Sequence, residues 1–128
     1  MLLKHVGLAC SAVDNADKFY QDLLGLNKSE PKILPSDLSK VIFNRDSELQ
    51  IINYRDETLH FEIFITGRIK EQFRQIAHLC LEVDDLSVFI EKCHQINVDV
   101  TQVSKGDKIL TFIKDLDGNL FEIKHSAR

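Results

Sequence analysis

Four side chains that can bind a metal ion or transfer a proton lie in strand-like stretches of this sequence: His5, Glu62, His78 and Glu122. Around each of them apolar and polar residues alternate, which is typical of a strand with one buried face. The tripeptide Phe-Glu-Ile occurs at 61–63 and again at 121–123, so both glutamates stand between two large apolar residues. Each strand is therefore expected to bury its apolar residues and to present its acid on the opposite face.

This set of side chains suits metal-assisted chemistry next to a carbonyl group. Two neutral imidazoles and two carboxylates can hold a divalent ion and leave two positions of an octahedral ion free. Two adjacent free positions fit a substrate with neighbouring oxygen atoms, whose developing negative charge the ion stabilises as a Lewis acid. A carboxylate that loosens from the ion can remove the proton beside the carbonyl and later return it.

The composition indicates a compact, soluble protein that binds neither nucleic acid nor membranes. The chain has 128 residues, 44% of them hydrophobic, enough for one ordinary domain or two small fused modules. Lys and Arg total 16 against 20 Asp and Glu, and no basic cluster is present. Three cysteines without paired spacing, no signal-peptide pattern and no apolar run of about 20 residues predict a cytoplasmic location.

The first half of the chain is expected to fold as a strand, a helix and three further strands. The first strand covers residues 3–10, and Asp14 or Asn15 can cap the helix that follows. Gly25 can end this helix, and after a polar connector at 27–39 strands are expected at 40–43, 48–54 and 59–66. The apolar face of the helix has the spacing of successive helical turns and consists of Ala16, Phe19, Tyr20, Leu23 and Leu24.

The second half repeats this order after a polar linker at 67–75. A strand at 77–83 is followed by a helix that Asp84 or Asp85 can cap. Strands follow at 99–103, 108–114 and 120–124, with a tight Asp-Gly turn at 115–118 between the last two. The apolar face of this helix lies seventy positions after that of the first and consists of Leu86, Phe89, Ile90, Cys93 and His94.

These elements predict an α+β fold made of two βαβββ modules, at about 1–66 and 76–128, within one domain that spans 1–128. A helix covers only one face of its sheet, so the face that carries the two histidines and two glutamates should stay open or line a cavity. Two such half-sheets side by side would bring these four side chains into one cleft.

Several short segments are weak signals alone but specific in their joint order. They are KHVGL at 4–8, FYQDLLGL at 19–26, IAHL at 76–79 with VDDL at 83–86, and FIKDLDGNLFE at 112–122. In this order they resemble the vicinal oxygen chelate superfamily, which includes glyoxalase I, methylmalonyl-CoA epimerase, fosfomycin thiol transferases, extradiol dioxygenases and bleomycin-resistance proteins. The resemblance covers nearly the whole chain and implies a paired, curved mixed sheet with helices on its outer face.

The resemblance also implies the roles of individual residues. It places the metal ligands at His5, Glu62, His78 and Glu122, and it leaves Gln50 as an alternative to Glu62, because 48–51 is a competing strand. Proton transfer falls to Glu122 and Glu62. The expected ion is Ni, Co or Zn, with Mn or Fe as further candidates, and no segment matches a pattern that binds a thiol cofactor.

The predicted function is that of a metal-dependent lyase or isomerase like glyoxalase I. Its substrate would be a small α-oxygenated carbonyl compound, such as a hemithioacetal, that reacts through a metal-chelated enediolate. The alternatives are a drug- or antibiotic-binding protein of the bleomycin-resistance type and a racemase like methylmalonyl-CoA epimerase. A homodimer is expected, with the site either within one chain or shared between two.

Other polar residues are expected to be structural. His60 is interpreted as a solvent-facing residue and Arg45 as solvated surface. Cys93 and His94 are placed in the core, because they belong to the apolar face of the second helix.

Overall fold

The computed structural model describes residues 2–67 and 77–127. The chain divides into two compact units, Met1–Glu71 and Gln72–Arg128, and each is described by itself. The predicted linker at 67–75 lies outside the described residues, apart from Gly67. No helix in the described part of the chain is long and apolar enough to cross a membrane.

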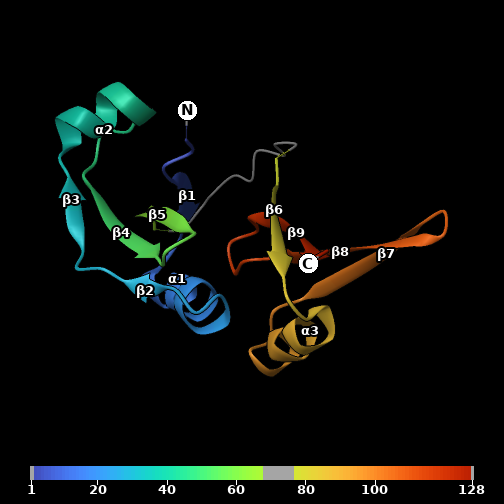
Figure 1. Cartoon of the computed structure of the whole chain (residues 1–128). Helices are drawn as coiled ribbons and strands as arrows, with labels where there is room; N and C mark the ends of the chain where they lie inside the picture. The colour runs from blue at the N-terminus through green and yellow to red at the C-terminus, as the bar shows by residue number, and fades with distance from the viewer. Residues whose placement is uncertain (1, 68–76, 128) are drawn as a thin grey trace. The chain divides into compact units, whose positions relative to one another are not determined.

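The sheet of unit 1 has the strand order β1-β5-β4-β2 (Figure 1). Its strands are β1 (Val6–Cys10), β2 (Asn27–Lys28), β4 (Leu49–Arg55) and β5 (His60–Ile65), and β3 (Lys32–Leu34) also pairs with β4. β1 runs parallel to β5, whereas the other pairs are antiparallel, so the sheet is mixed.

The helix of unit 1 covers one face of this sheet. It begins as α1 (Val13–Ala16) and continues with π-helical hydrogen bonding as η1 (Asp17–Leu23). Gly25 then takes a φ of 74°, and the N–H of Leu26 donates to the carbonyl of Tyr20 at 3.1 Å. Most buried side chains of unit 1 come from this helix and from the face of the sheet that it covers: Cys10, Ala16, Phe19, Tyr20, Leu23, Ile52, Tyr54, Phe61 and Ile63. Leu26 is buried just after the helix.

Two predictions for unit 1 are wrong. The helix begins at Val13 with Ala12 as its N-cap residue, so Asp14 and Asn15 lie inside it. Asn15 instead donates to the hydroxyl of Ser11 at 3.1 Å. The segment predicted as a strand at 40–43 belongs to a helix, α2 (Ser36–Phe43), and the edge strands β2 and β3 lie in the stretch predicted as a connector.

The helical form of α2 has a local physical cause. Pro35 fixes φ at −60° just before the first turn, and Asn44 ends the helix in the left-handed conformation with φ of 56°. Between them, Leu38, Val41 and Ile42 follow the helical spacing i, i+3, i+4 rather than strict alternation. All three side chains are exposed, so α2 adds little to the core.

Unit 2 repeats the architecture with the strand order β6-β9-β8-β7. Its elements are β6 (Leu79–Val83), α3 (Leu86–Gln95), β7 (Val100–Lys105), β8 (Lys108–Lys114) and β9 (Leu120–His125). β6 is parallel to β9, and the remaining pairs are antiparallel. Figure 1 shows β7 and β8 as a long hairpin. In chain order β7 stands where unit 1 has β2, β3 and α2, and β8 corresponds to β4.

The predicted cap and turn of unit 2 are confirmed, and one core prediction is wrong. The carboxylate of Asp85 accepts the N–H of Val88 at 3.0 Å and so caps α3. The turn at 115–118 is built on Asp115, whose carboxylate accepts the N–H of Asn119 at 2.8 Å. Cys93 is buried as expected, but His94 is exposed.

The two units confirm the predicted α+β fold with two βαβββ modules, each built on a mixed sheet. Their registers agree residue by residue. Val6 lies opposite Phe61 and Gly7 opposite Glu62 in unit 1, and Leu79 lies opposite Phe121 and Cys80 opposite Glu122 in unit 2. The internal repeat is therefore structural as well as sequential.

Candidate functional site

Each unit carries one pair of candidate ligands on the face of its sheet that the helix leaves uncovered. In unit 1, Nε2 of His5 lies 3.9 Å from Oε2 of Glu62. In unit 2, Nε2 of His78 lies 3.7 Å from Oε2 of Glu122. The structure thus brings the predicted residues together as two histidine–glutamate pairs, one in each unit.

Strand alternation fixes the direction of both glutamates. Phe61 and Ile63 are buried against the helix of unit 1, so Glu62 between them faces the other side. Phe121 and Ile123 hold Glu122 in the same way in unit 2. Each histidine lies just before a strand that is parallel to the glutamate strand, which brings the imidazole beside the carboxylate.

The four side chains remain accessible to a ligand. The histidine side chains are 43% and 49% exposed, and those of Glu62 and Glu122 are 26% and 15% exposed. The glutamates are thus partly enclosed while the histidines reach into solvent.

Both pairs fit the requirements of a divalent metal ion. Imidazole and carboxylate are common ligands of such ions, and two donors that each lie about 2.1 Å from one ion are at most about 4.2 Å apart. The separations of 3.9 Å and 3.7 Å satisfy this limit without a change of rotamer. Within either unit, the described His, Cys, Asp and Glu side chains form no cluster of three or more.

Gln50, the alternative second ligand, lies on the opposite face of the sheet from Glu62. It pairs with Ile65 on β5, and its neighbours at alternate positions on β4 are the buried residues Ile52 and Tyr54. Glu62 instead pairs with Asn53, on the face that also carries His5. A ligand from β5 that joins His5 is therefore Glu62.

The surroundings of His5 include a histidine that the sequence analysis assigned to solvent. The ring of His60 lies 5.2 Å from that of His5, and its Nε2 is 2.6 Å from Oδ1 of Asn53. Burial lowers the pKa of His60, and the neighbouring side chains of His5 and Arg55 lower it further. The lowered pKa favours the neutral form of His60, whose ring lies beside this histidine–glutamate pair on the strand face that it shares with Glu62.

The surroundings of His78 are different. Its ring meets that of Phe112 edge to face at a centroid distance of 6.5 Å. Nζ of Lys124 lies 4.0 Å from Oε1 of Glu122. Cys80, opposite Glu122, is an exposed thiol whose pKa is raised first by burial and then by the charge of Glu122.

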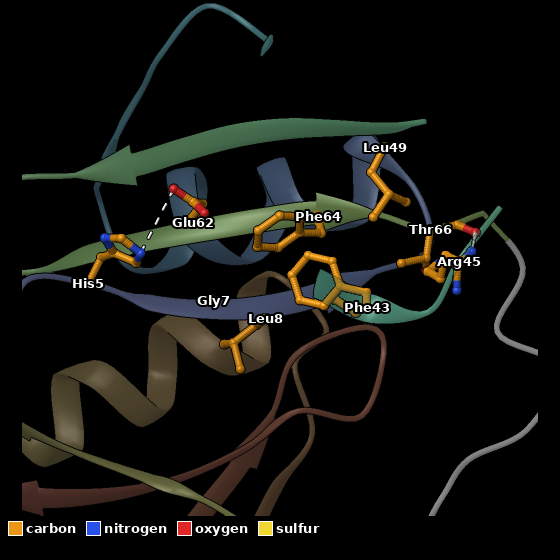
Figure 2. A pocket seen from close by; sticks show the side chains of 10 residues that line it. His5, Gly7, Leu8, Phe43, Arg45, Leu49, Glu62, Phe64 and Thr66 are labelled. Atoms are coloured by element: carbon orange, nitrogen blue, oxygen red, sulfur yellow. Dashed lines mark hydrogen bonds and ion pairs between the residues drawn. The ribbon is translucent and has the colours of Figure 1, made fainter. Parts of the chain in front are cut away.

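A cavity of about 390 Å³ opens beside the ligand pair of unit 1. Figure 2 shows His5 and Glu62 at one end, Arg45 and Thr66 at the other, and the rings of Phe43 and Phe64 between them. These rings meet edge to face at 5.0 Å. A cavity on this face was one of the two expected outcomes, but Phe43 was not expected to line it because residues 40–43 were predicted as a strand; the helical spacing of 38, 41 and 42 was the available signal.

The sequence matches a family described as the Glyoxalase/Bleomycin resistance protein/Dioxygenase superfamily over residues 4–112. Among curated proteins, it is 28% identical to the mitochondrial methylmalonyl-CoA epimerases of Mus musculus and Bos taurus. These alignments cover 97% of this chain and 72% and 74% of the two relatives.

Solved structures share the fold. A glyoxalase family protein from Enterococcus faecalis has a TM-score of 0.72 at 18% identity, over 95% of both chains. The fosfomycin resistance protein FosX from Listeria monocytogenes has a TM-score of 0.71 at 13% identity, over 99% of this chain and 94% of its own. A variant of FosX, with a TM-score of 0.68 at 14% identity over 95% of this chain and 87% of its own, was solved with Mn(II) and 1S,2S-dihydroxypropylphosphonic acid.

Proposed function

Because the chain belongs to the Glyoxalase/Bleomycin resistance protein/Dioxygenase superfamily, we propose that it is a metal-dependent lyase or isomerase of the glyoxalase type. Its substrate is a small α-oxygenated carbonyl compound, such as a hemithioacetal. Its metal ligands are His5, Glu62, His78 and Glu122, and the two units act together as one functional domain.

The observation that carries this proposal is the duplicated pair of a histidine and a glutamate at the same register in both units. A surface histidine near a glutamate is common, but two pairs at equivalent positions, 3.9 Å and 3.7 Å apart, are hard to explain by the fold alone. Packing of the core explains why Phe61 and Phe121 are apolar. It does not explain why a glutamate follows each of them or why a histidine lies beside it at the start of the parallel strand.

Each of these residues has a defined task in the proposed reaction. The neutral imidazoles of His5 and His78 and the two carboxylates hold a divalent ion, with Ni, Co or Zn as the first choice. When bound, that ion supplies Lewis-acid stabilisation of the negative charge that develops on the substrate oxygens. The carboxylate of Glu122 or Glu62 removes the proton next to the carbonyl and returns it to the neighbouring carbon.

Metal analysis of tag-free protein tests the ligand assignment. We expect one equivalent of a divalent transition metal in the wild-type protein and its loss in His78→Ala. A protein that takes up no metal under any loading condition would instead support the ligand-binding alternative of the bleomycin-resistance type.

Turnover of the hemithioacetal formed from methylglyoxal and a thiol tests the reaction. We expect isomerisation that depends on the loaded metal and falls at least 100-fold in Glu122→Gln, as expected for loss of a general base. Absence of turnover with several thiols and a loaded metal would remove the glyoxalase assignment.

A second candidate function is that of a methylmalonyl-CoA epimerase, which also moves a proton on the carbon next to a carbonyl. It is favoured by the two curated relatives, whose alignments cover 97% of this chain. Incubation with methylmalonyl-CoA in deuterated water distinguishes the two functions, because an epimerase incorporates deuterium at the carbon between the two carbonyl groups. Exchange in this thioester without turnover of hemithioacetals would establish the epimerase.

We further propose a homodimer. Mixing of His5→Ala with His78→Ala determines whether a site is shared between chains. If each site combines unit 1 of one chain with unit 2 of its partner, the mixed dimer regains one intact set of ligands and part of the activity. If the site lies within one chain, mixing restores nothing. The cytoplasmic location stays a prediction.

A further inference from the structure

The cavity of unit 1 is larger than a three-carbon substrate requires. Its volume of about 390 Å³ corresponds to roughly a dozen non-hydrogen atoms at the volume per molecule of liquid water. It also lies within the range of small-molecule sites, which begins at about 300 Å³. The cavity therefore has room for a substrate that extends well beyond the carbonyl group.

The walls of the cavity change character along β5. The imidazole and carboxylate of His5 and Glu62 lie at one end, and the rings of Phe43 and Phe64 line the middle (Figure 2). Arg45 lies at the other end, where its Nη2 is 3.5 Å from the carbonyl oxygen of Thr66. Thr66 lies four positions after Glu62, which corresponds to roughly 13 Å of extended chain.

The guanidinium of Arg45 is available to a ligand. The neighbouring acid, Asp46, is engaged by Nζ of Lys40 at 3.2 Å. Among residues 2–67, no carboxylate lies within ion-pair distance of Arg45, and its contact with Thr66 is at the outer limit of a hydrogen bond. Its planar fork of donors matches a carboxylate, and among the described residues that line this cavity there is no lysine or second arginine.

We propose that unit 1 selects substrates in which the reacting carbonyl is joined through a short apolar arm to a carboxylate, with Arg45 as the residue that binds this carboxylate. The inference rests on the proposed function for the position of the carbonyl beside Glu62. Arg45 is here a residue that determines specificity, and α2 is the element that brings it and Phe43 to the cavity.

Hydroxamates test this proposal, because their two neighbouring oxygens occupy a metal centre and their tails can be varied. Binding to the metal-loaded protein is measured by calorimetry for acetohydroxamate, octanohydroxamate and suberic acid monohydroxamate. The last two differ in that suberic acid monohydroxamate ends in a carboxylate. We expect suberic acid monohydroxamate to bind roughly 10- to 100-fold more tightly than octanohydroxamate, as for a charge-assisted hydrogen bond.

Two variants assign this preference to Arg45. In Arg45→Met the two long hydroxamates should bind equally, whereas Lys18→Met, which removes an exposed positive charge from η1 outside the cavity, should keep the preference. Equal binding of both probes to the wild-type protein, or an unchanged preference in Arg45→Met, would overturn the proposal. Thermal melts of both variants confirm that they are folded.

A metal-free comparison separates this proposal from the proposed function. Octanoate should bind the metal-free wild-type protein more tightly than octanamide, and this difference should disappear in Arg45→Met. If it does so while acetohydroxamate fails to bind the metal-loaded protein, the metal centre is wrong and the carboxylate site stands. If octanoate and octanamide bind equally, the carboxylate site is overturned.

Discussion

Units 1 and 2 have histidine–glutamate pairs of nearly the same geometry in different surroundings. The distance between imidazole and carboxylate differs by only 0.2 Å between the units, 3.9 Å against 3.7 Å. Around the ligands, unit 1 has Gly7, His60 and a cavity, whereas unit 2 has Cys80 and Phe112. The shared strand register thus places the histidine–glutamate pair in the same way in both units, whereas the segment between the helix and the last two strands differs.

That variable segment has a different structure in the two units. In unit 1 it forms two short edge strands and α2, which brings Phe43 to the cavity. In unit 2 it forms β7, which continues into β8 through a turn at Gly106 with φ of 63°. If both units supply metal ligands and unit 1 alone shapes the substrate pocket, substitutions of the ligands should have equal effects on metal binding in the two units. Equivalent substitutions elsewhere should then have different effects on substrate binding.

The largest expected effect is the loss of either histidine of the ligand pairs. His5→Ala and His78→Ala should each weaken metal binding by more than about 100-fold, because loss of a ligand should exceed the 10- to 100-fold cost of losing its supporting hydrogen bond. Metal content after dialysis and turnover of the hemithioacetal measure this effect.

Both variants should lose metal binding to the same extent if each unit supplies ligands to the ion. His94→Ala, which replaces an exposed histidine on α3, serves as the control and should retain the metal. A protein that keeps its metal in His5→Ala but loses it in His78→Ala would show that unit 2 alone holds the ion.

The next largest effect should come from the buried phenylalanines of the repeated tripeptide. Phe61→Ala and Phe121→Ala should each lower the free energy of unfolding by about 3–5 kcal/mol, the usual cost of removing a buried aromatic ring. Both side chains are 2% exposed or less. Urea unfolding monitored by circular dichroism measures this cost.

The exposed Phe43 provides the control for these two variants. Its side chain is 45% exposed, so Phe43→Ala should cost far less stability than either buried substitution. If Phe121→Ala alone is severely destabilising, the two cores do not contribute equally to folding.

The turns before the two glutamate strands give an intermediate effect. Asp115 is buried and accepts the N–H groups of Asp117 and Asn119, so Asp115→Ala should cost about 1–3 kcal/mol by leaving donors unpaired. Asp56 accepts the N–H groups of Thr58 and Leu59 in the same way in unit 1. Because Asp56 is exposed, Asp56→Ala should cost less in the same urea experiment.

The turn of unit 1 should also respond to pH. Hydrogen bonds from the backbone N–H groups of Leu59 and then Thr58 lower the pKa of Asp56 below its ordinary value of 3.8. A lowered pKa in the folded state stabilises the protein above that ordinary value, and this contribution is lost as the pH falls through the folded pKa. Asp56→Asn should therefore lose less stability on acidification than the wild-type protein; equal acid dependence would contradict this.

The elements that form the ligand pairs could be predicted from the sequence because local patterns determine them. Alternation around Glu62 and Glu122 gives the strand faces, and Asp85 and Asp115 act through hydrogen bonds to residues within four positions. The burial of Cys93 follows from its helical spacing. These signals need no knowledge of distant contacts.

The features that were missed depend on competition between local patterns or on contacts distant in sequence. The apolar run at 41–43 is compatible with a strand or a helix. It is helical because Pro35 starts α2 and Asn44, in the left-handed conformation, ends it. His94 is exposed because the chain turns at Asn97, with φ of 61°, and Val98 takes the buried place beside Cys93. The cavity requires Phe43 to meet Phe64 on another element, which no local pattern shows.

The smallest effects on stability are expected for Gly7→Ala and Cys80→Ala. Gly7 and Cys80 are equivalent residues, each opposite one of the two glutamates. A Cβ on Gly7 would lie 3.2 Å from Cε2 of Phe64, so the ring must shift by a few tenths of an ångström. The entropic gain of replacing a strand glycine, about 0.5–1 kcal/mol, should offset this crowding, so Gly7→Ala should change the free energy of unfolding by less than about 1 kcal/mol. Cys80→Ala, at an exposed position, should change it by less than about 0.5 kcal/mol.

The two substitutions should differ at the cavity instead. Phe64 lines the cavity of unit 1, so its displacement in Gly7→Ala should weaken binding of octanohydroxamate several-fold while leaving acetohydroxamate unchanged. Cys80→Ala should alter neither, because Cys80 is not among the described residues that line this cavity. If Gly7→Ala weakens binding of both probes equally, the added methyl group disturbs His5 and Glu62 rather than the cavity. That result would contradict the idea that Gly7 is needed for the substrate pocket of unit 1.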